Sequence, residues 1–103
     1  MATKSYAGVN VEVNDEGYLT DPSQWTPVIA KELAKEENIE LTDKHFEVLN
    51  FIREEHAKGN VLTIRKVGKS GVVDIKGFYD LFPGGPLKKA SKIGGIPKPS
   101  SCV

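Results

Sequence analysis

The most reactive side chain belongs to Cys102, which is the single cysteine of the chain and lies one residue from its end. A thiol reacts through its thiolate, so its reactivity depends on the charges around it. Lys98 and the other lysines nearby favour the thiolate, whereas the carboxylate of Val103 opposes it, and the sequence does not decide between them. The small neighbours Ser100 and Ser101 make a narrow tip that fits a cleft in another protein.

The other candidate catalytic or metal-binding side chains do not converge. His45 and His56 lie eleven residues apart in one predicted helix, about 16 Å along its axis, so they cannot share a metal ion. A single cysteine excludes a disulfide framework and a zinc site with several cysteines. A hydrolase needs a base beside its nucleophile, and neither histidine is near Cys102 in sequence. We therefore expect no metal and no cofactor, and we favour a non-catalytic carrier over a self-contained enzyme.

The segment before the thiol is rich in glycine and proline. Gly94 and Gly95 loosen the backbone, while Pro97 and Pro99 remove amide donors and favour extended conformations. These residues predict a flexible C-terminal arm over residues 94–103, with a reach on the order of 30 Å when fully extended. The alternative is a frayed terminus with an incidental thiol, since disorder concentrates at chain ends.

The charges are unevenly distributed, although the net charge is zero. Residues 1–60 contain six Lys and Arg and twelve Asp and Glu, a net charge of −6, whereas residues 61–103 contain eight and two, a net charge of +6. Either two solvated faces differ by chance, or a basic surface near the arm meets an acidic or anionic partner. In the second case the expected partner contacts are Lys92, Gly94, Gly95, Pro97, Lys98 and Pro99.

The elements that position these residues begin with a β-hairpin, predicted over residues 7–20. Valine alternates with polar residues over positions 9–13, which indicates a half-buried strand. Residues 14–17 predict a turn and residues 18–20 the returning strand. A lone two-stranded ribbon is marginally stable, so it must pack on an apolar surface.

Capping residues followed by apolar periodic runs predict about five helices. The first begins at Asp21-Pro22 or Thr26-Pro27 and frays at Glu37-Asn38, with an apolar face of Trp25, Val28, Ile29 and Leu33. The others span about 43–58, 63–69, 74–82 and 87–93, and both histidines are interpreted as helix-terminal or surface residues. Residues 1–93 are therefore expected to form a single domain of mainly α (α+β) class, with the hairpin on a bundle of about five helices and the flexible arm after it.

The helices at 63–69 and 74–82 flank a glycine-bearing turn and resemble a helix-turn-helix. Four basic side chains on this pair would contact phosphates if it bound DNA: Arg65, Lys66, Lys69 and Lys76. The second helix lacks arginine, asparagine and glutamine, the usual base-reading residues. Nucleic-acid binding, as a regulatory protein, is therefore an alternative to the carrier.

The length and composition fit one globular domain. The chain has 103 residues, of which 39% are hydrophobic and 27% charged. No apolar run approaches about eighteen residues, and the first six residues lack the apolar stretch of a secretory signal. We therefore expect a cytoplasmic protein without a membrane span, in a compartment that keeps the thiol reduced.

Several short motifs follow one another along nearly the whole chain. They are Gly17-Tyr18-Leu19, the region of Trp25, Leu41-Thr42 with His45, Phe51-Ile52-Arg53, and Leu81-Phe82-Pro83 followed by Gly85-Pro86. The most specific is the tail, Lys92-Ile93-Gly94-Gly95-Ile96-Pro97-Lys98-Pro99 with Cys102. With these motifs the sequence resembles the DsrC/TusE family of small sulfur-carrier proteins, which includes the gamma subunit of dissimilatory sulfite reductase.

The resemblance implies a helical core with an N-terminal β-hairpin and a flexible C-terminal arm. It also implies that Cys102 accepts sulfur as a persulfide and enters the active sites of partner proteins. DsrC proper has a second cysteine eleven residues earlier, and a sulfur atom joins the two in its trisulfide form. This chain has Ser91 at that position, so it cannot form an intramolecular trisulfide.

A single penultimate cysteine is typical of the TusE type, which receives sulfur from a TusBCD-like complex and passes it towards tRNA thiolation. The resemblance therefore implies a sulfur relay, with a TusBCD- or DsrEFH-like sulfurtransferase as donor and a sulfite reductase or a tRNA thiolase as acceptor. A DsrC-like partner of dissimilatory sulfite reductase, either divergent or with its earlier cysteine mutated to serine, is the alternative.

Overall fold

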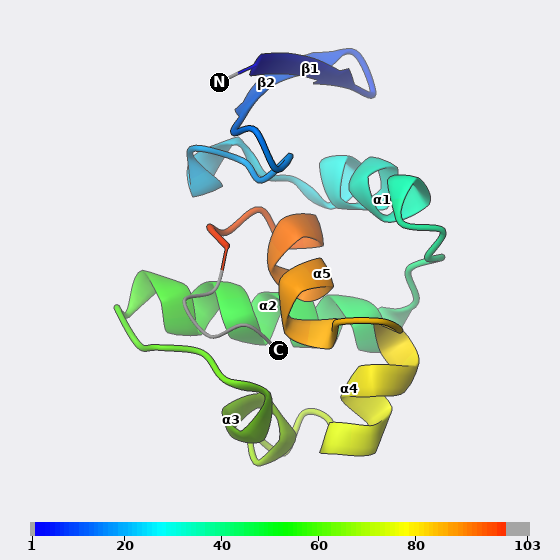
Figure 1. Cartoon of the computed structure of the whole chain (residues 1–103), viewed down its shortest axis with the longest axis vertical. Coiled ribbons are helices and arrows are strands. Elements are labelled where there is room, and N and C mark those ends of the chain that lie inside the picture. The colour runs from blue at the N-terminus through cyan, green and yellow to red at the C-terminus, as the bar shows by residue number, and fades with distance from the viewer. Residues whose placement is uncertain (1, 99–103) are drawn as a thin grey trace.

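A hairpin and a series of helices follow one another in the computed structural model, which describes residues 2–98 (Figure 1). The strands are β1 (Ala2–Tyr6) and β2 (Val9–Val13). A short 3-10 helix, η1 (Pro22–Gln24), and the helix α1 (Pro27–Glu36) come next. The remaining helices are α2 (Asp43–Ala57), α3 (Ile64–Gly68), α4 (Ile75–Leu81) and α5 (Pro86–Ile93). The predicted mainly α fold with an N-terminal hairpin is confirmed.

The hairpin contains a strand that was not predicted, because β2 pairs along its length with β1, which precedes it in the chain. The predicted return of residues 18–20 is present only as an isolated antiparallel bridge between Val13 and Leu19, with the Thr20 N–H donating to the Glu12 carbonyl at 3.1 Å. A two-residue turn at Ala7-Gly8 joins the strands, and its φ angles of 52° and 80° are both positive, as in tight hairpin loops. The first four residues of β1 are exposed. The strand therefore has no apolar alternation from which it could be predicted.

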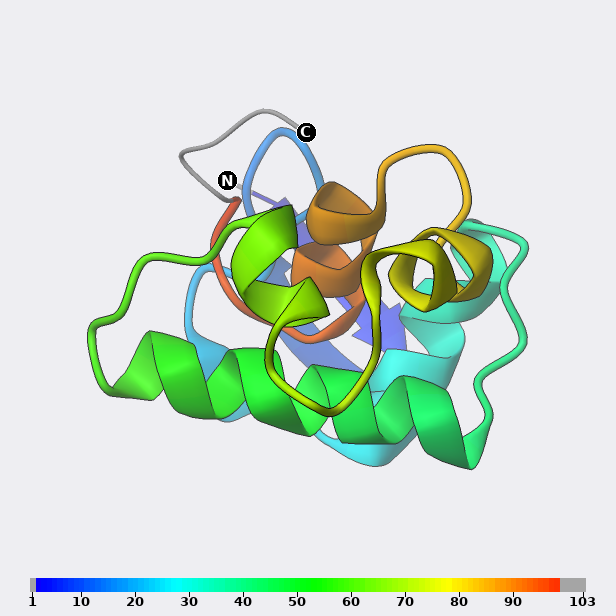
Figure 2. The same cartoon turned by 90° about the horizontal axis from the view of Figure 1, so that it is seen from below.

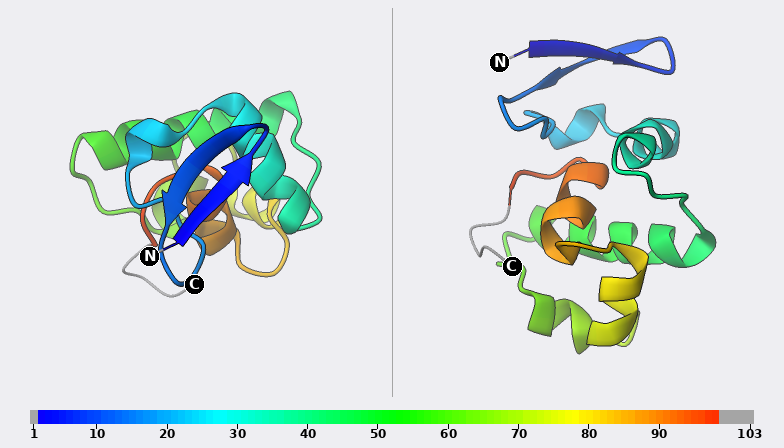
Figure 3. Two further views of the ribbon diagram at one scale, coloured as in Figure 1. Left: turned by 90° about the horizontal axis from the view of Figure 1, so that it is seen from above. Right: turned by 45° about the vertical axis from the view of Figure 1, so that its right-hand side comes forward.

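The ribbon is tied to the helices by side-chain hydrogen bonds. The Tyr6 hydroxyl donates to a carboxylate oxygen of Glu36 on α1 at 3.2 Å. The Gln24 side chain accepts from the Glu12 N–H at 2.9 Å and donates to the Glu12 carbonyl at 3.3 Å, along the outer edge of β2. Figures 1 and 3 place the ribbon at one end of the molecule, beside η1 and α1, and place α3 and α4 at the other end.

Local capping explains where the helices begin and end. Three helices begin with a side-chain oxygen that accepts a backbone N–H three residues on: Thr26, Thr63 and Asp74. Three helices end with a residue at positive φ, after which an N–H returns to a carbonyl of the last turn: Asn38, Gly59 and Gly95. Both predicted starts of the first helix are used, because Asp21 caps η1 and Thr26 caps α1.

The longest helix, α2, begins at a buried histidine. His45 lies in the first turn of α2, so the predicted helix-terminal position is confirmed. Its side chain is 6% exposed and therefore buried. Its Nδ1 accepts the Thr42 N–H at 3.1 Å, and its Nε2 therefore carries the proton and donates to the Leu81 carbonyl at 2.8 Å. α2 has fifteen residues, and no helix among residues 2–98 is long and apolar enough to cross a membrane.

The short helix α5 lies in the middle of the molecule, with α2 beside it (Figures 1 and 2). It packs against α1, α2 and α4. Its inward side chains are completely buried: Leu87, Ala90, Ser91 and Ile93. Since the arm follows α5 directly, the helix at the centre of the core also sets the point from which the arm departs.

The buried face of the first helix is predicted correctly at Ile29 and Leu33 and wrongly at Val28. Ile29 and Leu33 are completely buried or nearly so, but Val28 is 54% exposed, and the prediction that it is buried is wrong. The helix begins at Pro27, so Trp25 precedes it and does not define its inner face. Trp25 instead packs, half-buried, against the core.

Candidate functional site

The root of the arm folds back onto the domain. α5 ends where Gly95 adopts a φ of 70°, and the Ile96 N–H then donates to the Ser91 carbonyl at 3.1 Å. Ile96 is 2% exposed, so this residue of the predicted arm packs into the core. Pro97 and Lys98 are exposed. The mobility of the arm and its start at residue 94 stay predictions, and residues 99–103 with Pro99 and Cys102 lie outside the described part.

Two side chains, Trp25 and Arg53, hold this root and are called the clamp below. The Trp25 Nε1–H donates to the Ile93 carbonyl at 2.8 Å. One Arg53 amino group donates to the Gly94 carbonyl at 2.7 Å and the other to the Pro22 carbonyl at 3.1 Å. The guanidinium carbon also lies 4.3 Å from the centre of the Trp25 ring, a cation–π contact. The clamp therefore fixes the last turn of α5 against η1 and α2.

The two glycines of the root are needed for close packing. A Cβ on Gly95 would lie 2.6 Å from Trp25 Cδ1, and one on Gly94 would lie 2.9 Å from the Ala90 carbonyl oxygen. Gly95 also has the positive φ that other residues avoid. From the sequence, Gly94 and Gly95 were expected to loosen the backbone. In the structure they instead allow the backbone to pack closely against Trp25 and the last turn of α5.

The role of Arg53 was missed by the sequence reasoning. Burial lowers the pKa of its guanidinium from the ordinary value, and its planar fork satisfies two backbone carbonyls at once. The available signal was a lone arginine directly after Phe51 and Ile52 in an apolar stretch of α2. A charged residue in that position needs polar partners, and carbonyls at a helix end supply them.

A shallow hollow of about 300 Å³ lies beside the arm root, and we call it the lysine hollow. Its lining residues come from the turn after β2, the C-terminal end of α1, the turn before α5 and α5 itself: Glu16, Tyr18, Glu37, Gly84, Gly85, Lys88, Lys89 and Lys92. Lys98 of the arm reaches its rim, since its Nζ lies 3.0 Å from Glu16 Oε2. Burial, and then the charge of Glu16, raise the pKa of Tyr18. The predicted contacts Lys92 and Lys98 thus meet at one face.

The buried Ser91 hydroxyl is poorly accommodated. Ser91 is 0% exposed, and its Oγ has no hydrogen-bond partner within residues 2–98. It borders a second small hollow of about 220 Å³, whose lining includes His56, Ile96 and Pro97. A free cysteine behaves as a small hydrophobic residue with a weak donor, so the site suits a thiol better than a hydroxyl.

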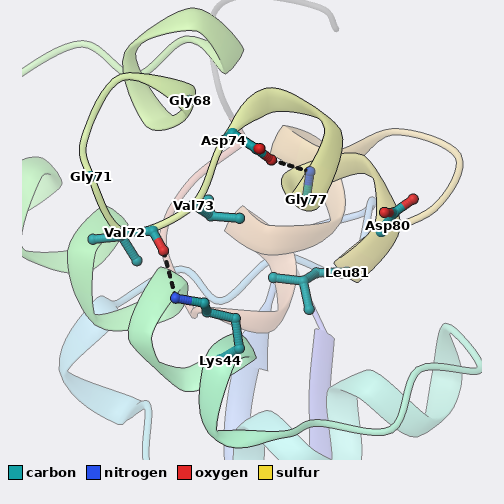
Figure 4. Close-up of a pocket in the computed structure, with 9 residues that line it drawn as sticks. All are labelled: Lys44, Gly68, Gly71, Val72, Val73, Asp74, Gly77, Asp80 and Leu81. Atoms are coloured by element: carbon teal, nitrogen blue, oxygen red, sulfur yellow. Dashed lines mark hydrogen bonds between the residues drawn. The ribbon is translucent and has the colours of Figure 1, made fainter.

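The predicted helix-turn-helix pair is formed by α3 and α4, which pack closely on each other. A Cβ on Gly68 would collide with Ile75, and one on Gly77 would lie 2.7 Å from Val73. The two glycines therefore permit the tight approach. Figure 4 shows the hollow of about 630 Å³ beside this turn, where Lys44 Nζ donates to the Val72 carbonyl at 2.7 Å.

The charges on this pair do not form a clear phosphate-binding surface. Lys66 forms an ion pair with Glu55 of α2, with 3.2 Å between Nζ and Oε1. Arg65, Lys69 and Lys76 are exposed. The hollow in Figure 4 is also lined by two carboxylates, Asp74 and Asp80, which repel phosphate. Nucleic-acid contact by Arg65, Lys66, Lys69 and Lys76 stays a prediction.

The two histidines have separate surroundings. Both ring nitrogens of His45 are engaged by the protein, which leaves neither for a metal ion. His56 is exposed and borders the hollow next to Ser91. Within the described residues, no three His, Cys, Asp or Glu side chains form a group that could hold a metal ion.

Comparison with known proteins decides the family. Residues 5–103 match the family described as DsrC like protein, a match that includes Ser91 and Cys102. The chain belongs to the DsrC-like family. Its DsrC-like sequence is 44% identical over 101 residues to the sulfurtransferase TusE of Buchnera aphidicola subsp. Schizaphis graminum, covering 90% of this chain and 89% of the relative. It is 36% identical to the sulfurtransferase TusE of Escherichia coli K12, covering 95% and 97%.

Solved structures place the fold in the same family. The NMR structure of Allochromatium vinosum DsrC superposes with a TM-score of 0.84 at 36% identity, covering 98% of this chain and 97% of that one. The oxidized gamma subunit of the dissimilatory sulfite reductase (DsrC) from Archaeoglobus fulgidus superposes with a TM-score of 0.84 at 30% identity, covering 99% and 100%. The predicted resemblance and the DsrC-like fold are therefore confirmed.

Proposed function

We propose that this DsrC-like protein is a sulfur carrier that holds one sulfur atom as a persulfide on Cys102 and passes it to a partner protein. The observation that carries the proposal is the family match, which extends over residues 5–103 and contains a single thiol. Relatives named sulfurtransferase TusE, 36–44% identical, support the same function. A reducing cytoplasm suits the proposal, because it keeps a lone thiol available.

The chemistry is an exchange between sulfur atoms without net oxidation. The Cys102 thiolate attacks the terminal sulfur of a persulfide on the donor, one S–S bond forms and another breaks, and the donor thiolate leaves. Delivery is the same exchange, with an acceptor thiolate attacking the terminal sulfur and the Cys102 thiolate leaving. With one thiol in the chain, both steps are intermolecular.

In this proposal the clamp holds the base of the arm, and the arm carries the thiol to the partner. Trp25 and Arg53 hold the end of α5, so the arm departs from a fixed point on the core. Beyond Ile96 the exposed Pro97 and Lys98 lead towards the thiol. A narrow segment that departs from a rigid base can enter a cleft without moving the domain. We propose that the partner contacts the arm and its root at six residues: Lys92, Gly94, Gly95, Pro97, Lys98 and Pro99.

The serine at position 91 supports a relay over a DsrC that uses two thiols. The proposed donor is a sulfurtransferase complex of the TusBCD or DsrEFH type, and the proposed acceptor is a tRNA thiolase. A sulfite reductase is the alternative acceptor, because the structural neighbours include gamma subunits of that enzyme.

Mass spectrometry after loading tests the function. The protein is incubated with sodium polysulfide, which supplies sulfane sulfur without a partner protein, and the intact mass is measured. The expected result is a gain of one sulfur atom in the wild type and none in Cys102→Ser. A wild type that gains no sulfur, or an equal gain in the variant, would overturn the proposal.

A further inference from the structure

The reach of Cys102 is short, because the structure holds the root of the arm on the domain. The clamp and the buried side chain of Ile96 fix the chain as far as residue 96. The six residue steps from Ile96 to Cys102 span at most about 20 Å when fully extended. A segment that is free from residue 94 would have eight steps and reach about 27 Å. A partner atom that reacts with the thiol must therefore come within about 20 Å of Ile96, from which Pro97 and Lys98 leave the domain.

The surface next to Lys98 is the lysine hollow. Lys98 Nζ lies 3.0 Å from a carboxylate oxygen of Glu16, and Glu16 lines the hollow. The ammonium groups of Lys88, Lys89 and Lys92 form no hydrogen bond or ion pair within the described residues. A protein that receives the thiol from this side of the domain covers these three charges, and it must supply opposite charges or leave the ammonium groups without water and without a partner.

The acidic residues of the hollow indicate which kind of partner fits. Glu16 and Glu37 line it together with the lysines, and Glu16 is already paired with Lys98. A nucleic-acid backbone carries a phosphate at every nucleotide and would meet both carboxylates as well as the lysines. A protein surface can place Asp and Glu side chains over the lysines alone. The mixed charges therefore favour a protein.

We propose that the lysine hollow is the docking surface for the protein that exchanges sulfur with Cys102, and that this partner carries a rim of Asp and Glu side chains around its reactive cysteine. The inference rests on the proposed function. The rim lies over Lys88 and Lys89 while the arm enters the cleft that the rim surrounds. Exposed charge pairs of this kind steer association and weaken as salt screens them.

Charge reversal with a matched control tests the surface. Lys88→Glu/Lys89→Glu changes the hollow, and Lys69→Glu/Lys76→Glu makes the same change of charge on α3 and α4, which line neither the hollow nor the arm root. A purified TusBCD-type complex, loaded with persulfide, donates sulfur to increasing concentrations of each protein. The hollow variant is expected to raise KM about tenfold with kcat within about twofold, and the control to change KM less than about twofold.

The outcomes separate the docking surface from the carrier function. Each protein is first loaded with sodium polysulfide, and circular dichroism confirms its fold; Lys88→Gln/Lys89→Gln replaces the hollow variant if that variant does not fold. Normal loading together with equal KM values for the hollow and control variants would overturn the docking surface and leave the carrier function intact. A wild type that does not load would overturn the carrier function itself. Added tRNA that raises KM in the wild type, and not in the hollow variant, would show a nucleic-acid surface and would also overturn the proposal.

Discussion

Replacing Ser91 with alanine is expected to stabilise the fold, although the change removes an atom from its centre. Ser91 lies on α5 with 0% of its surface exposed, and within residues 2–98 its hydroxyl has no hydrogen-bond partner. Such a group loses its hydrogen bonds to water on folding and gains none in return. Alanine keeps the Cβ and favours the helix, so the substitution removes the group that is unfavourable.

The expected gain is the difference between two effects. An unsatisfied buried hydroxyl lowers the free energy of unfolding by about 1–3 kcal/mol. The missing oxygen leaves a void on the order of 15 Å³, which costs about 0.4 kcal/mol at roughly 24 cal/mol per Å³. The net gain is about 1–2 kcal/mol, which raises Tm by at least about 4 °C in a chain of this size.

Urea unfolding followed by circular dichroism measures the change, and the midpoint is expected to rise with an unchanged slope. Ser70→Ala is the matched control. The Ser70 hydroxyl donates to the Val67 carbonyl at 2.6 Å and accepts the Val72 N–H at 3.1 Å, so alanine there lowers the free energy of unfolding by about 1 kcal/mol. A midpoint for Ser91→Ala equal to or below that of the wild type would refute the reasoning, because the hydroxyl would then have a partner in the folded protein.

Gly95→Ala is expected to lower the free energy of unfolding by about 2–4 kcal/mol, since it combines an unfavourable φ with a Cβ only 2.6 Å from Trp25. Gly59→Ala shares the positive φ but meets nothing within 4 Å, so it should lose only about 1 kcal/mol, and equal losses in urea unfolding would contradict the close contact. Stability is also expected to fall as the pH rises from about 10 to about 12, because burial, and then Glu36, raise the pKa of Tyr6 from 10.0 to about 12 and the unfolded chain ionises first. This contribution is fully present below pH 10, and an unchanged pH slope in Tyr6→Phe would show that another group is responsible.

The helices were predictable because their signals are local. Capping side chains such as Thr63 and Asp74 lie within three residues of the N–H groups that they accept. β1 was not predictable in the same way, since its first four side chains are exposed and its sequence has no apolar alternation. The register of β2 with β1 depends on the turn at Ala7-Gly8, and alanine is a weak signal for a positive φ.

The candidate site was predictable in its chemistry but not in its geometry. The lone thiol and the lysines after Pro83 can be read from the sequence. The clamp cannot, because Arg53 reaches a carbonyl that is 41 residues away along the chain. The grouping of Lys98 with Glu16 joins residues that are 82 positions apart. Contacts of this range follow from the way α5 and the arm root pack against α2 and the turn after β2, and no periodic pattern in the sequence indicates them.

The clamp also gives the protein an optical probe of its own. Trp25 is the one tryptophan of the chain, and its ring touches Arg53 while its Nε1–H binds the last carbonyl of α5. Indole emission depends on the polarity and charge around the ring. A change at the arm root will therefore alter the fluorescence of the unlabelled protein, and partner engagement can be followed in real time without attaching a dye near the thiol.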